Sequence, residues 1–311
     1  MVKYLFWRIL TGFLTVFFIV TVVFFAIRLI PGDPAEIWLG DYATPDLINL
    51  TRTKWGLDKP IWLQYVKYTI NVISLDLADS LRMRVPVGEL LLRHYPYTIR
   101  LVIFASLLSI LVAIPAGVVA AVNQNSIIDV AVMTFSFLVI STPSFWLGLL
   151  MLIVFSFSLG WVPSMGGESS GNILNYFSYL ILPTICLGLQ QAGLISRMVR
   201  STMIDILCKE YILVARSKGL SENVIRYKHA LKNALPPIIS LVGVSLVISL
   251  AGAVVLEVVF SRPGIGRLFV NAIATRDYPL IQGSILFIST GVVFINTFID
   301  IAYGFIDPRV Q

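Results

Sequence analysis

The sequence is poor in charged residues, in cysteine and in histidine, and each shortage excludes a class of protein. Of its 311 residues only 13% are charged, whereas a soluble domain carries about 25%. Because 57% of the residues are hydrophobic and the mean hydropathy is +0.87, we expect an integral membrane protein. The two cysteines cannot build a disulfide framework, and Cys186 in an apolar run is not expected to pair with Cys208 in a basic segment.

Signatures of catalysis and of nucleotide binding are also missing. The sequence holds no GxxxxGK loop followed by Ser or Thr, so the chain itself is not expected to bind ATP. It has no GxSxG turn and no acidic pair at catalytic spacing, and His94 and His229 lie outside the apolar runs. We therefore predict no catalytic residue, no metal site and no cofactor bound by this chain. The net charge of +6 does not indicate nucleic-acid binding, because the basic residues lie beside apolar runs.

Six apolar runs are long enough for membrane helices, which need about 20 residues. The third run exceeds the roughly 30 Å thickness of a hydrocarbon core, and we expect it to tilt, to protrude or to bend at Pro143, which interrupts helical hydrogen bonding. The first run is too long for a secretory signal and ends without a small-residue cleavage site, so we interpret it as an uncleaved span. The predicted fold class is an all-α polytopic membrane protein with spans within Ile9–Ile30, Ile99–Val122, Ile128–Gly160, Tyr176–Ser196, Pro236–Phe260 and Gly283–Ile306.

Lysine and arginine near the ends of these runs predict the orientation. Lys3 and Arg8 place the N-terminus in the cytoplasm, and Arg309 places the C-terminus there as well. The polar insert 197–235 contains eight Lys or Arg residues and is also placed inside, whereas the outer loop 161–175 has none. Three arginines of the outer segment 261–282 are exceptions to this rule: Arg262, Arg267 and Arg276.

The chain is expected to have three parts: residues 1–30 with the first span, an extracytoplasmic segment 31–98, and a core of five spans, 99–311, that contains the insert. The segment 31–98 is too polar to cross a membrane. Within it, Ile61–Ile73 is expected to form a short helix. That helix carries aromatic residues typical of the membrane interface: Trp62, Tyr65 and Tyr68. The segment is either a solvated connector with interfacial anchors or a surface that receives a partner or substrate outside the membrane.

The insert has the pattern of a helical hairpin. Apolar residues fall on one face of a helix from Val199 to Lys218. Gly219 can then turn the chain, because glycine alone accepts a positive φ without strain. Ser221 is expected to cap a second helix with its hydroxyl; that helix runs to about Asn233, before Pro236-Pro237 end it. The insert either only fixes topology or docks a cytoplasmic partner, and the glycine corner and the cap in register favour docking.

Several short segments, taken together and in their order along the chain, carry a resemblance to a known family. Within the insert they are Glu210-Tyr211, Ala215-Arg216-Ser217-Lys218-Gly219-Leu220 and His229-Ala230-Leu231-Lys232-Asn233-Ala234-Leu235-Pro236. Outside it they are Leu29–Pro34, Trp55–Pro60, Ser261–Arg267, Arg276–Gln282 and Asp307–Arg309. The insert resembles the EAA loop of ABC-importer permeases, most closely those of the dipeptide, oligopeptide and nickel subfamily. The resemblance covers nearly the whole chain, and the segments taken together in this order are highly specific.

This resemblance implies a type I ABC importer permease fold with six spans in a bacterial cytoplasmic membrane. It also implies four partners: a related second permease subunit, two cytoplasmic ATPases that carry ATP and Mg, and an extracytoplasmic binding protein. The expected cargo is short peptides. Nickel chelates, glutathione or another small solute are the alternatives, because the same permease pattern serves all of them.

The resemblance also assigns roles within the insert. Glu210, Ala215 and Gly219 match the EAA positions. Leu220, Ser221 and Glu222 match the start of the coupling helix that rests in a groove of the ATPase. Tyr211 departs from the general pattern, which has Ala there, although bulky residues at this position are common in the subfamily.

Charged residues within apolar runs cost about 2.5–3.5 kcal/mol or more at the bilayer centre, so each requires an explanation. Arg28, Arg100 and Glu257 lie near the ends of their runs and are expected to extend to the membrane surface. Asp300 lies deeper, and Asn296 shares its helical face. We expect this pair to face protein, either joining two spans or lining a pathway. The alternative is a self-contained secondary transporter that uses Asp300 as its ion site, although the internal repeats usual in such folds are not found.

Overall fold

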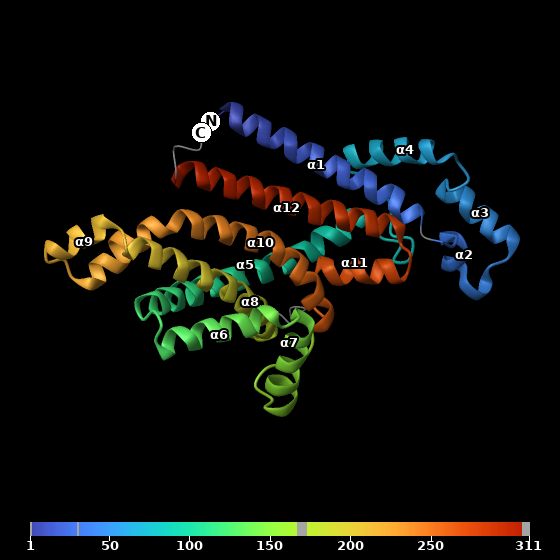
Figure 1. The fold of residues 1–311 in the computed structure, drawn as a ribbon. Helices are drawn as coiled ribbons and strands as arrows, with labels where there is room; N and C mark the ends of the chain where they lie inside the picture. Colours follow the sequence, from blue (N-terminus) through green and yellow to red (C-terminus); the bar gives the residue numbers. More distant parts are fainter. Residues whose placement is uncertain (1, 30, 167–172, 307–311) are drawn as a thin grey trace. The chain divides into compact units, whose positions relative to one another are not determined.

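The structure, a computed structural model, describes residues 2–29, 31–166 and 173–306, and it confirms the predicted all-helical class (Figure 1). The helices are α1 (Val2–Arg28), α2 (Pro34–Leu39), η1 (Gly40–Tyr42), α3 (Pro45–Trp55), α4 (Ile61–Ile73), α5 (Val87–Val122), α6 (Ile127–Ser141), α7 (Ser144–Met151), η2 (Leu152–Ser158), α8 (Ile173–Leu207), α9 (Glu210–Ser217), η3 (Val224–Leu231), α10 (Lys232–Val259), α11 (Ile265–Ala274) and α12 (Tyr278–Ile306). The stretches η2 and η3 are π-helical. The predicted terminal segment Asp307–Arg309 lies outside the described residues.

The chain forms two compact units. Within the described residues, unit 1 comprises 98–166, 173–262 and 294–306, and unit 2 comprises 2–29, 31–97 and 263–293. Helices α5 and α12 therefore contribute residues to both units. Each unit has its own hydrophobic core.

The predicted membrane spans are present as five straight candidates and one bent pair. The five are Trp7–Arg28, Val87–Val122, Asn175–Leu207, Val224–Val259 and Tyr278–Ile301. The third apolar run is broken: Ile127–Ser141 and Ser144–Ser158 meet at 104°. Thr142 is extended (φ −86°, ψ 126°), as the residue before a proline prefers to be, and Pro143 then starts α7. The predicted bend at Pro143 is confirmed.

In unit 1, α8 packs against α6 and α10, and small residues allow the helices to approach closely. A Cβ atom added at Gly117 of α5 would lie 2.7 Å from the Ser196 carbonyl of α8. One added at Gly188 of α8 would lie 2.9 Å from the Ala105 carbonyl of α5. Close approach at small residues is the usual way that helices pack in a membrane, where lipid and side chains are equally apolar.

In unit 2, the short helix α4 has the bounds that the sequence predicts and lies beside α1 (Figure 1). The ring of Tyr68 stacks on Phe24 of α1 at 5.3 Å, and Tyr65 meets the same ring edge-on at 5.2 Å. Trp62, by contrast, is 66% exposed. Two of the three predicted interfacial aromatics thus pack on α1, and one remains on the surface. The anchor that the sequence suggested is in large part an attachment of α4 to the first span.

Arg28 at the end of α1 is held by contacts within unit 2. Its Nε and Nη2 donate to the Gln64 side-chain oxygen at 3.2 and 3.1 Å, and its Nη1 donates to the Phe24 carbonyl at 3.0 Å. Arg100 in unit 1 is exposed and lies 5.6 Å from the ring of Tyr176. The cationic group at each of these span ends thus has a polar or aromatic neighbour.

The expectation that Glu257 extends to the membrane surface is wrong. Glu257 is 1% exposed, and its carboxylate accepts a hydrogen bond of 2.5 Å from the Thr98 hydroxyl. Arg262, one of the three arginines of the outer segment, is also fully buried and donates to the Tyr179 carbonyl at 3.1 Å. Because α10 ends at Val259 and the chain turns back, both charges are enclosed by α5 and α8. The burial of Arg262 explains one exception to the positive-inside rule, since this side chain is part of the core.

Both cysteines are free thiols, as predicted. Cys186 is buried in α8, and Cys208 is exposed just beyond its end.

Candidate coupling site

The predicted hairpin is present in unit 1, but its first arm is two helices. Helix α8 ends at Leu207, and α9 begins at Glu210 after an extended Lys209 (φ −77°, ψ 148°). The prediction of one helix from Val199 to Lys218 is therefore wrong at Cys208-Lys209. The apolar pattern continues across the break because α8 and α9 cover the same core, which includes Met203 of α8 and Ile212 of α9.

The second arm is longer than predicted. The π-helical stretch η3 runs directly into α10, which continues through Pro236 and Pro237. The prediction that these prolines end the helix is wrong, because the φ of about −65° that a proline ring imposes is itself helical. What proline removes is its own N–H group, and the helix continues across this loss. The second arm and the fifth span thus form one continuous helix.

Gly219 lies at the corner of the hairpin in the left-handed region, with φ of +75°. Its N–H donates to the Arg216 carbonyl at 2.9 Å, and the Leu220 N–H donates to the Ala215 carbonyl at 3.3 Å. These two bonds form a Schellman motif, which satisfies the last carbonyls of α9. No atom lies within 4 Å of a Cβ added at Gly219. The corner therefore requires glycine for its backbone angle and not for lack of space.

A carboxylate joins the two sides of this corner. Glu222 accepts hydrogen bonds from Nε of Arg216 at 2.9 Å and from its Nη2 at 3.4 Å, and Nε of Arg226 lies 3.7 Å away. The hydrogen bond from Arg216 lowers the pKa of the Glu222 carboxyl. The Ser221 backbone carbonyl accepts from Ile225 N–H at 3.1 Å. The predicted cap by the Ser221 hydroxyl is not among the hydrogen bonds of the described residues.

The space between the two arms is filled by small and branched residues. Ile212, Ile225, Ala230 and Ala234 are fully buried, and Ala215 is 8% exposed. An alanine at 215 lets α9 lie close to η3, where a larger side chain would push the arms apart. Ala215 therefore acts in packing, whereas Glu210 is exposed at the first residue of α9. A negative charge at a helix N-terminus is favoured by the helix dipole.

One side-chain hydrogen bond between the two arms was not predicted from the sequence. The Asn233 side-chain amide donates to the Tyr211 hydroxyl at 3.0 Å and to the His229 carbonyl at 2.9 Å. Tyr211 is the position at which the sequence departs from the general EAA pattern. Its hydroxyl thus has a structural partner on the other arm, which an alanine would lack.

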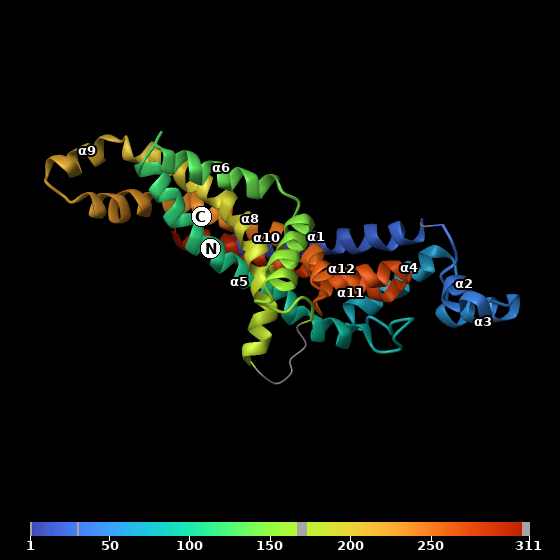
Figure 2. The same cartoon turned by 90° about the horizontal axis from the view of Figure 1, so that it is seen from below.

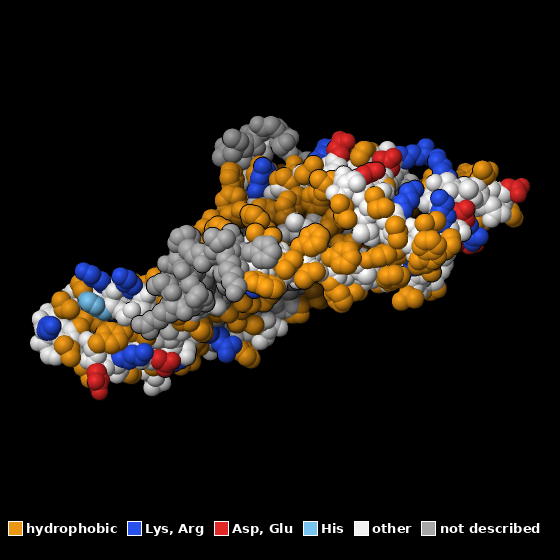
Figure 3. Space-filling model, turned by 90° about the horizontal axis from the view of Figure 1, so that it is seen from above, with side chains coloured by type: hydrophobic (Ala, Val, Ile, Leu, Met, Phe, Trp, Pro, Cys, Tyr) orange, Lys and Arg blue, Asp and Glu red, His pale blue; other side chains and the backbone are white. Residues whose placement is uncertain are grey.

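The outer side of the hairpin exposes apolar side chains among charged ones, as Figure 3 shows at the end of the molecule that carries α9. Leu213, Val214 and Tyr227 are 56%, 52% and 55% exposed, and Leu220 at the corner is 40% exposed. Exposed lysines lie among them: Lys209, Lys218 and Lys228. Apolar patches rimmed by charge are typical of surfaces that bind another protein.

The remaining predicted polar residues lie on α12. Asn296 is exposed on the surface of the chain, and Asp300, one turn further, is half-buried. Their role in a pathway or between spans stays a prediction. Within the described residues, no group of three or more His, Cys, Asp or Glu side chains could hold a metal ion.

Comparisons with known proteins place the chain among transport proteins. The family described as binding-protein-dependent transport system inner membrane component matches residues 113–311, and the corresponding N-terminal family matches residues 1–102. The chain is 38% identical to the dipeptide transport system permease protein DppB of Alkalihalophilus pseudofirmus, with 93% of each chain covered. It is 35% identical to the glutathione transport system permease protein GsiC of Escherichia coli O6:H1, covering all of this chain and 99% of the other.

The fold is also similar to a solved one. A chain in an inward-facing structure of the MetNI methionine ABC transporter matches with a TM-score of 0.58 and 18% identity, covering 70% of this chain and 96% of that one. At this identity the similarity shows the fold alone. In this chain the described residues hold five candidate spans, or six where the bent pair counts as one span.

Proposed function

Because the chain belongs to the family of binding-protein-dependent transport system inner membrane components, we propose that it imports short peptides as one permease subunit of an ATP-driven transporter. As a member of this family, the chain is a multi-pass protein of the cytoplasmic membrane. Peptide as cargo is supported by relatives such as the dipeptide permease DppB and the di/tripeptide permease of Pseudomonas aeruginosa, the latter 39% identical. Glutathione, itself a short peptide, is the cargo in the name of another relative. Nickel chelates remain the alternative cargo.

The coupling hairpin is the observation that carries the mechanism. Its corner is fixed by the Schellman motif at Gly219 and by the Glu222–Arg216 ion pair. Its second arm continues without a break into α10. We infer that two partner ATPases, which bind ATP and Mg, press on the exposed face of the hairpin and thereby move the attached spans. A second, related permease subunit completes the pathway in this proposal.

Reconstitution tests this function directly. The chain, with the second permease and the two ATPases, is placed in liposomes, and uptake of a labelled dipeptide is measured with ATP inside and the binding protein outside. We expect uptake that requires both. Competition by glutathione and by a nickel chelate then distinguishes the cargoes. Gradient-driven uptake by the chain alone would instead establish a secondary transporter and overturn the proposal.

A pocket of about 600 Å³ in unit 2 is proposed to receive the binding protein. Its aromatic side is formed by Trp38 and Trp55, whose rings meet edge-on at 5.5 Å. Its cationic side is formed by Lys54, Lys67 and Arg84, none of which forms an ion pair among the described residues. These three basic residues outnumber Asp79, the one acidic residue of the lining. Aromatic and basic groups in one hollow fit an acidic, partly apolar segment of a protein outside the membrane.

Charge reversal tests this surface. The double variant Lys54→Glu and Arg84→Glu is expected to weaken the apparent affinity of the binding protein about tenfold, with a smaller effect at high salt, because surface charges act mainly by attraction during encounter. The measurement is ATPase activity as a function of binding-protein concentration. Lys59→Glu, an exposed change in the same segment outside the pocket, is the control, and it is compared with Lys54→Glu alone so that both variants change the net charge equally. Equal effects from the two variants would remove the pocket from the proposal.

A further inference from the structure

We propose that α6 and α8 move as one body during the transport cycle, and that Asp129 and Arg200 are the positioning residues that hold them together. This inference rests on the importer function proposed above. It concerns side chains to which the proposed coupling role assigns no part, and it follows from a series of polar contacts between two helices of unit 1. In Figures 1 and 2 these helices lie side by side.

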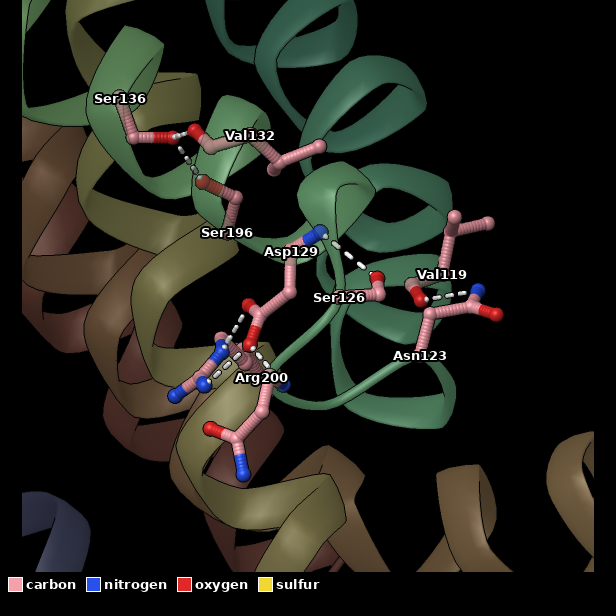
Figure 4. Close-up of polar contacts among 9 residues, drawn as sticks. Val119, Asn123, Ser126, Asp129, Val132, Ser136, Ser196 and Arg200 are labelled. Carbon is pink, nitrogen blue, oxygen red and sulfur yellow. Dashed lines mark hydrogen bonds and ion pairs between the residues drawn. The ribbon is translucent and has the colours of Figure 1, made fainter.

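The first contact is a bidentate ion pair at the start of α6 (Figure 4). Nε and Nη2 of Arg200 donate to the two carboxylate oxygens of Asp129 at 2.5 and 2.6 Å. The Asp129 side chain is only 4% exposed. The Asn125 N–H donates to the same carboxylate at 2.9 Å, and the Ser126 hydroxyl caps α6 by accepting from the Asp129 N–H. A paired guanidinium and carboxylate fix direction as well as distance.

The second contact lies two helical turns further along α6. The Ser136 and Ser196 hydroxyls are 2.9 Å apart and both buried (Figure 4). A Cβ atom added at Gly193 would lie 2.9 Å from the Ser136 carbonyl, so the helix backbones nearly touch here. Both serines also line an apolar cavity of about 300 Å³ between α5 and the α6–α8 pair. The packing of α6 is therefore tight against α8 and loose toward α5.

The third contact lies at the end of α6. The Gln190 side-chain amide donates to the Thr142 carbonyl at 2.8 Å, next to the bend at Pro143. Proline has no N–H, so backbone hydrogen bonding is interrupted at this bend, and an α8 side chain meets the carbonyl beside it. Residue numbers fall along α8 as they rise along α6, as expected for two antiparallel helices. Axial slip of one helix would break all three contacts together.

The two ends of this pair connect to different parts of unit 1. At its Arg200 end, α8 enters the hairpin core through Val199, Met203 and Ile206. Beyond the bend, α7 packs on α10: a Cβ added at Gly148 would lie 3.3 Å from the Leu256 side chain of α10. Movement of the hairpin is thus passed through α8 to α6, and the backbone at Thr142–Pro143 is the joint between α6 and α7.

A disulfide between α6 and α8 tests this directly. Cysteines at Ser136 and Ser196, in a Cys208→Ser background, have side-chain atoms close enough to bond after a small adjustment. We expect oxidised and reduced complexes to differ less than twofold in ATP-driven peptide uptake and in binding-protein-stimulated ATPase activity. A tenfold fall on oxidation that reverses on reduction would show that the helices must separate, and would overturn the proposal. Counting free thiols under denaturing conditions confirms that the bond has formed.

The positioning role has its own readout. Arg200→Gln is expected to lower uptake about tenfold relative to ATPase activity, and the oxidised 136–196 disulfide is expected to restore it to within threefold. If Arg200 served some purpose other than joining α6 to α8, the 136–196 disulfide would not restore uptake. Failure of the disulfide to restore uptake would therefore overturn the assignment. Should Arg200→Gln fail to assemble, the disulfide in the native background decides alone. If the unmodified complex imports no peptide, the proposed cargo fails, whereas stimulated ATPase activity still tests whether α6 and α8 move as one body.

Discussion

Replacing Gly219 by valine is expected to lower ATP-driven uptake at least about tenfold, while the protein still enters the membrane and assembles with its partners. A left-handed backbone angle costs a residue with a side chain about 1–2 kcal/mol, and more for a β-branched one. That cost falls on the Schellman motif, so the corner opens and the Arg216–Glu222 ion pair loses its geometry. The ATPases would then turn over ATP without moving α10. The measurement is the ratio of peptide uptake to ATP hydrolysis in liposomes.

Gly219→Asn is the matched control. Asparagine accepts the left-handed region better than most residues, and a side chain at 219 meets no neighbour within 4 Å. We therefore expect Gly219→Asn to keep uptake within about threefold of the native level, although its side chain is larger than that of alanine. Similar losses for Asn and Val would show that the ATPase contacts this position and needs an empty surface there. Native coupling in the valine variant would contradict the role of the corner altogether.

The corner could be predicted from the sequence because its cause is local. A positive φ after a helix selects glycine whatever lies around it, so Gly219 was identified correctly. The break at Cys208-Lys209 has no such local mark. Apolar spacing reports which residues face the core, and α8 and α9 share one core on both sides of the break. The pattern therefore continued where the helix did not.

At Pro236-Pro237 the sequence predicts a helix end that the structure does not have. Pro143 and Pro236-Pro237 look alike in the sequence, yet only Pro143 breaks its helix. The residue before it, Thr142, is extended, whereas Pro236 and Pro237 continue a helix that begins at Lys232. A proline removes one hydrogen bond and biases one neighbour, and the surrounding packing decides whether the helix survives.

The contacts that join distant segments could not be read from the sequence. Asp129 and Arg200, like Tyr211 and Asn233, come together only because their helices pack in one particular register. A single chain offers many such charge and amide pairs at similar distances along the sequence. For Glu257, proximity to the end of a run suggested the surface, and the turn after α10 instead folds it inward.

Glu257→Ala is expected to destabilise the chain by about 3–5 kcal/mol, because it removes one of two opposite buried charges in one turn of the chain, where the Arg262 N–H donates to the Glu257 carbonyl at 2.8 Å. Thr98→Val removes only a hydrogen-bond donor to the carboxylate and is expected to cost about 1–3 kcal/mol. Glu257→Gln keeps an oxygen that accepts from Thr98 but loses the charge, so we expect it to lie between the two.

The thiol of Cys186 provides the measurement, because it is buried in α8 and becomes reactive when unit 1 unfolds. In a Cys208→Ser background, reaction with a thiol-reactive dye is used to measure the midpoint of unfolding. This midpoint should fall in the order native, Thr98→Val, Glu257→Gln and Glu257→Ala. The charge, and not the hydrogen bond, is then the larger part of the effect. If Glu257→Ala unfolded no earlier than Thr98→Val, the two buried charges would not stabilise each other, and burial of Arg262 would depend on its contact with the Tyr179 carbonyl instead.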